Sequence, residues 1–168
     1  MSCVPFVVVV LVGALLLKHV QCSPGTKYTD ARRAEFRNAV ARELATMRPE
    51  RLAARERVDC TSDKCLCSAG GAEFYGRYCG LGHYSCNMST APCDAMDTCC
   101  QTHDACCTAL GKRACPCHLA AESCMECVYV GIKYEGRRPS SSGWVCPDTL
   151  TAIVRTAAAL HYVTQECF

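Results

Sequence analysis

The first apolar pattern along the chain is a continuous run near its amino terminus. Residues 4–17 are apolar and uncharged, and the run ends at Lys18. This stretch of about 14 residues is shorter than the roughly 20 that a membrane-spanning helix needs, and it has the length of the apolar core of a secretory signal. Val20 and Cys22 place small residues at positions −3 and −1 of a cleavage site after Cys22. We therefore predict a secretory signal peptide over residues 1–22, with a membrane anchor as the alternative.

The second apolar pattern has the period of a helix. Phe36, Val40, Leu44 and Met47 follow one another at i, i+4, i+8 and i+11, so they share one helix face. Basic side chains surround this stripe at Arg32, Arg33, Arg37, Arg42 and Arg48. We expect Pro49 to end the helix, because proline has no N–H to continue the backbone hydrogen bonds.

The segment that contains this helix, residues 23–58, is basic and has no cysteine. One interpretation is a solvated surface helix that covers the core. A second is a removable pro-segment, since Arg51, Arg55 and Arg57 offer basic cleavage points. A third is an amphipathic helix that lies on anionic lipid. The sequence alone leaves these three interpretations open.

A second helix is predicted over residues 94–110. The segment follows Pro92 and carries Asp94 and Asp97 in its first turns, where the helix dipole favours carboxylates. Gly111 marks its end. Before it, residues 60–93 are rich in glycine, cysteine and serine and show no alternation long enough for a sheet, so we expect cross-linked loops there.

Two more helices are predicted in the last third of the chain. Residues 117–130 are opened by Pro116 and ended by Gly131. The final helix is expected from about Asp148 to Thr164. Its apolar positions are suited to burial, at Leu150, Ile153, Val154, Ala157 and Tyr162.

The cysteine content indicates the class of protein. The chain has 168 residues, of which 18 are cysteines, and a fraction above roughly 8–10 % in a short chain is typical of a disulfide scaffold from an oxidising compartment. Removal of the predicted signal peptide takes away Cys3 and Cys22 and leaves an even number, which suggests up to eight bridges. All of the remaining cysteines lie within residues 59–168, which we predict to be one all-α, disulfide-rich domain of a secreted protein. The net charge of +2 gives no reason to expect nucleic acid as a partner.

Two motifs carry candidate chemistry. Residues 75–82 read Tyr-Gly-Arg-Tyr-Cys-Gly-Leu-Gly. Glycines at alternate positions let the backbone turn its carbonyls inward, and such a loop can offer neutral oxygens to a hard cation such as Ca²⁺. A glycine-rich turn held by a disulfide is the simpler interpretation of the same residues.

The second motif, residues 97–107, reads Asp-Thr-Cys-Cys-Gln-Thr-His-Asp-Ala-Cys-Cys. On a helix, His103 and Asp104 are about 100° apart, so both can border one cleft while doing different work. A positioned histidine suits general-base chemistry near neutral pH, and a carboxylate suits Ca²⁺. The surrounding cysteines indicate that this helix is immobilised.

Together the two motifs resemble the secreted phospholipase A2 family, with Tyr-Gly-x-Tyr-Cys-Gly-x-Gly followed by Asp-x-Cys-Cys-x-x-His-Asp-x-Cys. The resemblance runs from about Cys60 to Cys127 and is most similar to the plant-type branch, with Cys86 and Cys93 between the motifs. It implies two antiparallel helices cross-linked by disulfides, a Gly-rich calcium loop and flanking helices. The implied activity is calcium-dependent hydrolysis of the sn-2 ester of glycerophospholipids, at a membrane or micelle surface, to a lysophospholipid and a fatty acid.

The resemblance also implies roles for individual residues. His103 matches the histidine that takes a proton from the attacking water, and Asp104 matches the calcium-binding carboxylate. Tyr78, Gly80 and Gly82 match the positions whose backbone carbonyls complete the Ca²⁺ site, and the Gly80 N–H matches a donor to the oxyanion. Three bridges carry over as well, namely Cys79–Cys100, Cys99–Cys124 and Cys106–Cys117.

Two positions depart from the family pattern. Many members have an aspartate after the Cys-x-Cys that holds the second nitrogen of the catalytic histidine, and this chain has His118 there. A neutral His118 can accept the same hydrogen bond but does not supply the carboxylate's charge. Cys107 replaces a supporting tyrosine. We therefore include His118 among the candidate catalytic residues.

Other functions remain as alternatives. The cysteine and histidine content suggests a zinc site as one alternative. Only Cys124 and Cys127 have the spacing of a zinc-finger pair, however, and secretion favours disulfides. A non-catalytic secreted binding protein or toxin could use the same scaffold.

We expect a monomer that binds phospholipid surfaces as a peripheral protein. Asn87 opens an N-glycosylation sequon.

Overall fold

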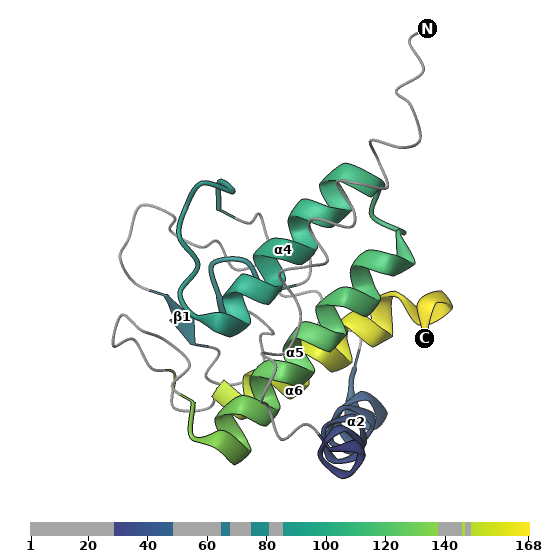
Figure 1. The fold of residues 1–168 in the computed structure, drawn as a ribbon. Helices are drawn as coiled ribbons and strands as arrows, with labels where there is room; N and C mark the ends of the chain where they lie inside the picture. Colours follow the sequence, from purple (N-terminus) through teal and green to yellow (C-terminus); the bar gives the residue numbers. More distant parts are fainter. Residues whose placement is uncertain (1–28, 49–64, 68–74, 81–85, 138–145, 147–148) are drawn as a thin grey trace, which may run out of the picture.

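The computed structural model describes residues 29–48, 65–67, 75–80, 86–137, 146 and 149–168. The predicted signal peptide, Pro49 and Gly82 lie outside these described residues. The described part is mostly helical, with α2 (Asp30–Thr46), β1 (Leu66–Cys67), β2 (Tyr75–Gly76), α4 (Ala95–Leu110), α5 (Cys115–Glu135), α6 (Thr149–Val163) and the short 3₁₀ turn η2 (Gln165–Cys167). The prediction of an all-α, disulfide-rich fold is confirmed (Figure 1).

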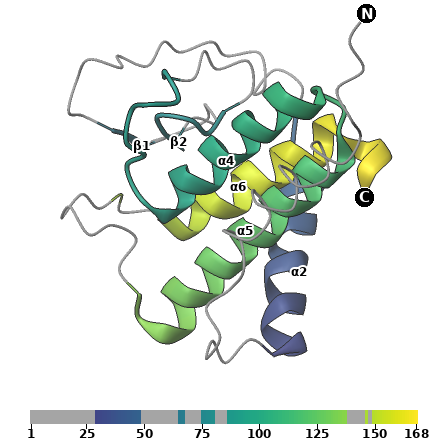
Figure 2. The same ribbon diagram turned by 45° about the horizontal axis from the view of Figure 1, so that its top comes forward.

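The four helices of the described part pack around α5, which contacts each of the other three. Helices α4 and α5 pack against each other, α6 packs against α5, and side chains of all three helices line one pocket (Figures 1 and 2). Helix α2 packs against α6 and α5, where Glu43 pairs with Arg155 and Arg33 with Glu126. The site described below is therefore built on α4, which α5 supports from one side.

Helix α2 uses the apolar face that the sequence predicts. Phe36 and Val40 are buried in the core, and Leu44 and Met47 pack against it. The Phe36 ring lies 5.3 Å from the ring of Tyr129 in α5. Of the three interpretations of residues 23–58, this burial argues against the helix on lipid, because an apolar face packed on α5 and α6 is not free to enter a lipid surface.

Helix α4 begins and ends at the predicted residues. Asp94 is its N-cap, and its carboxylate accepts the N–H of Asp97 at 2.9 Å. Gly111 follows the last turn with φ of +101°, a conformation that favours glycine. The cap residues therefore determine this helix locally, which is why its bounds follow from the sequence.

Helix α5 is longer than predicted, and the expected stop at Gly131 is wrong. The helix continues through Gly131 to Glu135 and ends at Gly136, which has φ of +62° and donates its N–H to the carbonyl of Gly131. Gly131 is buried, and a Cβ there would lie 2.8 Å from Cδ of Arg137. The glycine thus makes room for the returning chain instead of ending the helix.

A small antiparallel sheet lies where only loops were expected. Leu66 pairs with Gly76 and Cys67 with Tyr75. Two residues a strand is too short to leave an alternating pattern in the sequence. The final helix, predicted from about Asp148 to Thr164, spans Thr149–Val163.

Disulfides join the helices to each other and to the loop before α4. The three expected bridges, Cys79–Cys100, Cys99–Cys124 and Cys106–Cys117, are all present. Two further bridges in the described part are Cys65–Cys93 and Cys115–Cys167. Cys107 is a free thiol, so the bridges do not reach the upper limit of eight that the even cysteine count allows.

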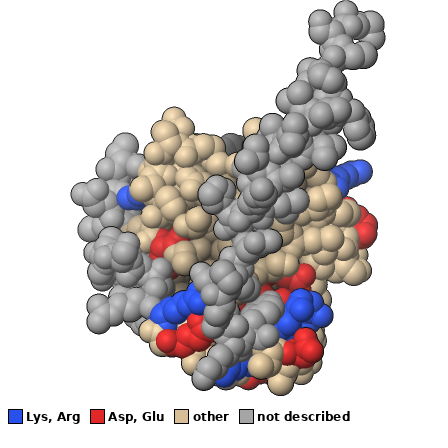
Figure 3. Space-filling view, viewed as in Figure 1, with Lys and Arg blue, Asp and Glu red and all other residues tan. Residues whose placement is uncertain are grey.

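Charges of both signs lie side by side on the face that Figure 3 shows. Figure 3 shows Lys and Arg interspersed with Asp and Glu around α2, at the lower end of that face. Within the described residues, no helix is long and apolar enough to cross a membrane.

Candidate active site

A pocket of about 80 Å³ lies where the glycine-rich loop meets α4. His103 and Asp104 of α4 line it together with Tyr78 and Gly80 of the loop. Its remaining wall comes from the Cys79–Cys100 bridge and from side chains of α5 and α6, namely Met125, Thr156, Ala159 and Leu160. The volume suffices for several water-sized groups.

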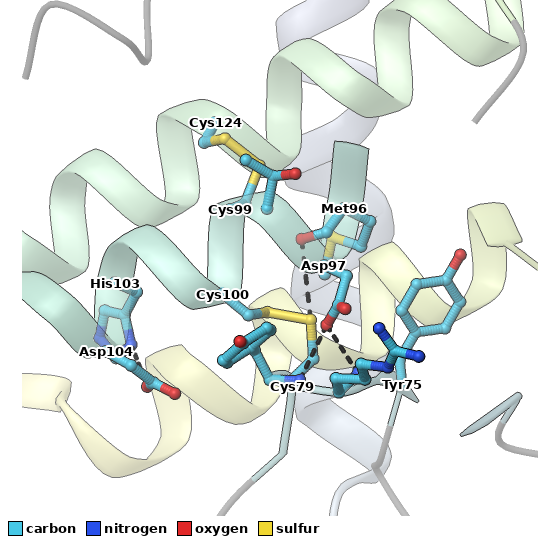
Figure 4. The surroundings of a disulfide bond; sticks show 12 residues. Tyr75, Cys79, Met96, Asp97, Cys99, Cys100, His103, Asp104 and Cys124 are labelled. Carbon is cyan, nitrogen blue, oxygen red and sulfur yellow. Dashed lines mark hydrogen bonds and ion pairs between the residues drawn. A yellow bond between two sulfur atoms is a disulfide. The ribbon is translucent and has the colours of Figure 1, made fainter. Parts of the chain in front are cut away.

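The carboxylate of Asp97 holds the loop against α4. Its Oδ1 accepts the backbone N–H of Arg77 at 2.9 Å and of Tyr78 at 2.8 Å, and its Oδ2 accepts the N–H of Cys93 at 2.8 Å. Figure 4 shows this side chain pointing from α4 toward the loop beside the Cys79–Cys100 bridge. Asp97 is fully buried, so these hydrogen bonds replace its hydration.

Gly76 permits this close approach. It has φ of +64°, and a Cβ at this position would lie 2.3 Å from Oδ1 of Asp97. Sequence reasoning assigned Asp97 only to the helix dipole and missed its role as the anchor of the loop. The pairing of Gly76 in the loop with a buried acid on α4 depends on tertiary packing and leaves no local pattern.

Tyr75 makes a second link between the loop and the start of α4. Its hydroxyl donates to Oδ2 of Asp94, the N-cap of the helix, and also lies 3.4 Å from Oγ1 of Thr149 in α6. Burial and the neighbouring carboxylates raise the pKa of the Tyr75 hydroxyl well above its usual value, so it remains a donor. The loop is therefore held by a disulfide, a carboxylate and a tyrosine.

A chain of hydrogen bonds determines the proton positions on the two histidines. The carbonyl of Lys112 can only accept, so His118 donates to it from Nε2 at 3.1 Å. Burial and the adjacent His103 lower the pKa of His118, which keeps this ring neutral and leaves its Nδ1 as an acceptor. His103 therefore donates from Nε2 to His118 Nδ1 at 2.9 Å. In the neutral ring of His103 the lone pair is then on Nδ1.

Asp104 lies on the side of His103 that carries this lone pair. Its Oδ1 is 3.6 Å from Nδ1 of His103, and the side chain is 31 % exposed. Figure 4 shows the two side chains next to each other on α4, away from the Asp97 anchor. A base and a carboxylate thus face one pocket.

Several of the predicted Ca²⁺ ligands lie together at this pocket. Asp104, Tyr78 and Gly80 line the same pocket, and Ca²⁺ takes carboxylate and carbonyl oxygens as ligands, which are groups that these residues carry. Gly82, the remaining predicted ligand, lies outside the described residues. Among the predicted site residues, the structure brings His103, Asp104, Tyr78 and Gly80 to the pocket.

Cys107 lies one turn after His103 on α4. Its Sγ is 3.4 Å from Nε2 of His103, on the side away from Asp104's contact with Nδ1. Burial and the charge of Asp104 raise the pKa of the Cys107 thiol. A thiol in this environment stays protonated and is a poor nucleophile, so Cys107 is not an activated cysteine of the protease kind.

Comparison with models of protein families, with curated proteins and with solved structures finds no match to this chain. The functional interpretation therefore depends on the geometry of the pocket and on the motifs that build it. Two features of this geometry were not predicted from the sequence, namely the Asp97 anchor and the contact of Lys112 with His118.

Proposed function

We propose that this chain is a secreted, calcium-dependent phospholipase A2 that hydrolyses the sn-2 ester of glycerophospholipids. The observation that carries the proposal is the chain of contacts from the Lys112 carbonyl through His118 to Nε2 of His103, with His103 and Asp104 lining the same pocket. From these contacts we infer that a neutral His103 has its lone pair on Nδ1. A neutral imidazole nitrogen beside an oxygen-lined cation site is the arrangement that water activation needs.

His103 acts as the general base. Its Nδ1 takes a proton from a water molecule as that water attacks the ester carbonyl carbon. The ring becomes cationic, and its Nε2–H donates to the neutral His118, which spreads part of the charge. His118 is thus a positioning residue, since it holds the ring of His103 in one tautomer and orientation. The proton on Nδ1 then passes to the leaving alkoxide.

Asp104 and the carbonyls of Tyr78, Gly80 and Gly82 would hold Ca²⁺. When bound there, the ion polarises the ester carbonyl and neutralises its developing negative charge. The N–H of Gly80 is the expected second donor to that oxygen. The Asp97 anchor and the Cys79–Cys100 bridge keep this backbone segment in register with α4, so no reorganisation is needed at the moment of reaction.

The scaffold supports this assignment beyond the pocket. Cys99 and Cys106, early and late in α4, bond to Cys124 and Cys117, which come in the opposite order in α5. This order suits two antiparallel helices, as the resemblance to secreted phospholipases A2 implies. The disulfides suit an oxidising, extracellular compartment. The partner surface is a phospholipid bilayer or micelle.

The alternative is a non-catalytic binding protein on the same scaffold. A binding protein has no need of the His103 tautomer or of the Asp104 carboxylate beside it. Since both are present in one pocket, we favour the enzyme.

Fatty-acid release from phospholipid vesicles tests the proposal. We expect release that requires Ca²⁺ and stops in EGTA, and a loss of at least about a hundredfold in His103→Gln, the usual worth of a general base. His161→Gln is the matched control, because His161 contacts Glu122 and lies outside the pocket. Activity that persists in EGTA or in His103→Gln would contradict the mechanism, and the absence of any release would favour the binding protein.

A further inference from the structure

A second donor set lies on the other edge of His103. Nε2 of His103, Sγ of Cys107 and Nδ1 of His118 all lie within 4.8 Å of one another. The two shortest separations are 2.9 Å between the nitrogens and 3.4 Å between Sγ and Nε2 of His103. We call these three side chains the His–Cys–His cluster.

The cluster differs from the oxygen-lined pocket in its chemistry. Imidazole nitrogen and thiolate sulfur select zinc and similar transition metals, whereas Ca²⁺ takes oxygen. Ligands of a tetrahedral zinc ion are about 3.3 Å apart for two nitrogens and about 3.6 Å apart for nitrogen and sulfur, given bond lengths near 2.05 and 2.3 Å. The Sγ to Nε2 separation of 3.4 Å is close to this value, and the two ring nitrogens, 2.9 Å apart, need to part by a few tenths of an ångström. The remaining separation, from Sγ to Nδ1 of His118, is within 4.8 Å and shortens as the three atoms close on one ion.

The two histidines of the cluster contact the kinds of oxygen acceptor that metal-binding histidines have on their other ring nitrogen. A ligating histidine donates its other ring N–H to a carbonyl or a carboxylate, which determines its tautomer. His118 donates from Nε2 to the carbonyl of Lys112, so its Nδ1 is available as a ligand. Nδ1 of His103 lies 3.6 Å from the carboxylate of Asp104, so a carboxylate stands behind the second ring as well.

The unpaired state of Cys107 fits the same role. The described part of the chain is densely cross-linked, yet this half-buried thiol has no partner cysteine and contacts a histidine instead. His103 and Cys107 are four residues apart on α4 and therefore share one face, and His118 completes the group from α5. This spacing is unlike that of zinc fingers, which explains why the Cys-x-x-Cys pattern did not indicate it.

We propose that the His–Cys–His cluster binds a divalent transition-metal ion of the zinc type and that this binding switches off His103 as a base. A metal ion on Nε2 moves the ring proton of His103 to Nδ1, where it points at Asp104. The lone pair that activates water is then lost, and the Asp104 carboxylate is engaged by the ring. The inhibitory part rests on the proposed function, while the binding part does not.

The protons balance as follows. His103 keeps one proton, which moves from Nε2 to Nδ1, and His118 keeps its proton on Nε2. Cys107 loses its thiol proton, so each ion bound releases one proton to solvent. No oxidant or reductant takes part.

Cobalt(II) titration of the metal-free, full-length secreted protein tests the binding. We expect a thiolate-to-cobalt charge-transfer band in the near ultraviolet with one ion bound, and zinc should abolish the band by displacement. Cys107→Ser should lose the band and bind cobalt at least about tenfold more weakly, and His161→Gln should behave as wild type. Unchanged affinity in Cys107→Ser, or bound cobalt without the band, overturns the proposal.

The alkylation rate of Cys107 in the wild-type protein tests the metal site without depending on a variant that folds. We expect zinc to slow the alkylation of Cys107 by iodoacetamide, followed by peptide mass spectrometry, and Ca²⁺ to leave it unchanged. An alkylation rate that zinc does not change overturns the site.

Fatty-acid release with and without zinc, at saturating Ca²⁺, tests the inhibition. We expect zinc to inhibit release in the wild type and in His161→Gln over the concentration range in which it displaces cobalt. Binding of cobalt without any fatty-acid release under Ca²⁺ would sink the proposed function and leave the metal site standing. Release that zinc does not inhibit, in a protein that binds it, would refute the switch.

Discussion

His103 and His118 are joined by a hydrogen bond of 2.9 Å from Nε2 of the first ring to Nδ1 of the second. The direction of this bond is set from outside the pair, because the carbonyl of Lys112 occupies the other nitrogen of His118. A backbone carbonyl six residues before His118 thereby determines which nitrogen of His103 can act as a base. Lys112 acts through its carbonyl, so its side chain is not required for this role.

Two substitutions of His118 separate its contacts. Asn places an oxygen near the position of Nδ1 and can still accept from His103, whereas Gln places its amide near Nε2 and keeps only the bond to Lys112. We expect His118→Gln to lower kcat about tenfold to a hundredfold, as for the loss of a hydrogen bond to a charged group worth about 1.5–3 kcal/mol. His118→Asn should lose much less, measured as fatty-acid release.

The pH profile distinguishes this positioning role from a general loss of structure. Without its acceptor, the cationic form of His103 is less stabilised, so the acid limb of the kcat profile should move to lower pH in His118→Gln and stay close to wild type in His118→Asn. Equal rates and equal profiles in the two variants would show that His118 does not position His103.

The stability of the fold should depend on pH through His118. Burial and the neighbouring His103 lower the pKa of His118 in the folded protein, so the unfolded chain takes up a proton first as the pH falls. The free energy of unfolding should therefore decline as the pH falls through the ordinary histidine pKa of about 6.5, and this contribution is fully present above it. Urea denaturation in EDTA between about pH 7.5 and 5 measures this decline, which should be shallower in His118→Asn.

Gly76 should be the least replaceable glycine of the described loop. Gly76→Ala places a methyl group within 2.3 Å of the Asp97 carboxylate at a φ of +64° and should displace the anchor. We expect a loss of several kcal/mol in unfolding free energy, about 1–2 kcal/mol of it from the backbone conformation alone.

Gly136→Ala is the matched control for this substitution. Gly136 has nearly the same φ, +62°, but open space where its Cβ would lie. The Gly136→Ala variant should lose only the backbone cost of about 1–2 kcal/mol in unfolding free energy. Similar losses in both variants, measured by urea denaturation, would mean that the contact with Asp97 is unimportant.

Arg33 of α2 should stabilise the fold through a buried acid of α5. Its Nε lies 3.0 Å from Oε1 of Glu126, whose side chain is only 2 % exposed, while that of Arg33 is 39 % exposed. Arg33→Ala leaves a buried carboxylate without this partner. We expect a loss of about 2–3 kcal/mol, below the 3–5 kcal/mol of a fully buried pair because water reaches Arg33. Arg42→Ala, at an exposed position of the same helix, should change stability by less than about 0.5 kcal/mol.

The same contact predicts the amino terminus of the mature protein. Loss of α2 would uncover Glu126 and the surfaces that bury Phe36 and Val40. We therefore expect the secreted chain to retain α2, with an intact mass that corresponds to cleavage near residue 22. An intact mass, measured under denaturing conditions, that corresponds to a chain beginning after Arg51, Arg55 or Arg57 would support the pro-segment instead.

The sequence by itself determines the helices, because their signals are local. Asp94 and Gly111 bound α4 through contacts within a few residues, and the spacing of Phe36 and Val40 sets the buried face of α2. The two motifs also predict which residues meet at the pocket, since a disulfide from Cys79 to Cys100 brings the loop to His103 and Asp104.

Only the tertiary structure decides what those residues can do. The buried pair of Gly76 and Asp97, and the free thiol of Cys107 beside His103, arise where separate segments pack together. Gly131 shows the same limit, because a glycine that reads as a helix stop instead admits the side chain of Arg137. Helix ends depend on neighbours in sequence, whereas proton positions and donor sets depend on neighbours in space, and no periodicity records them.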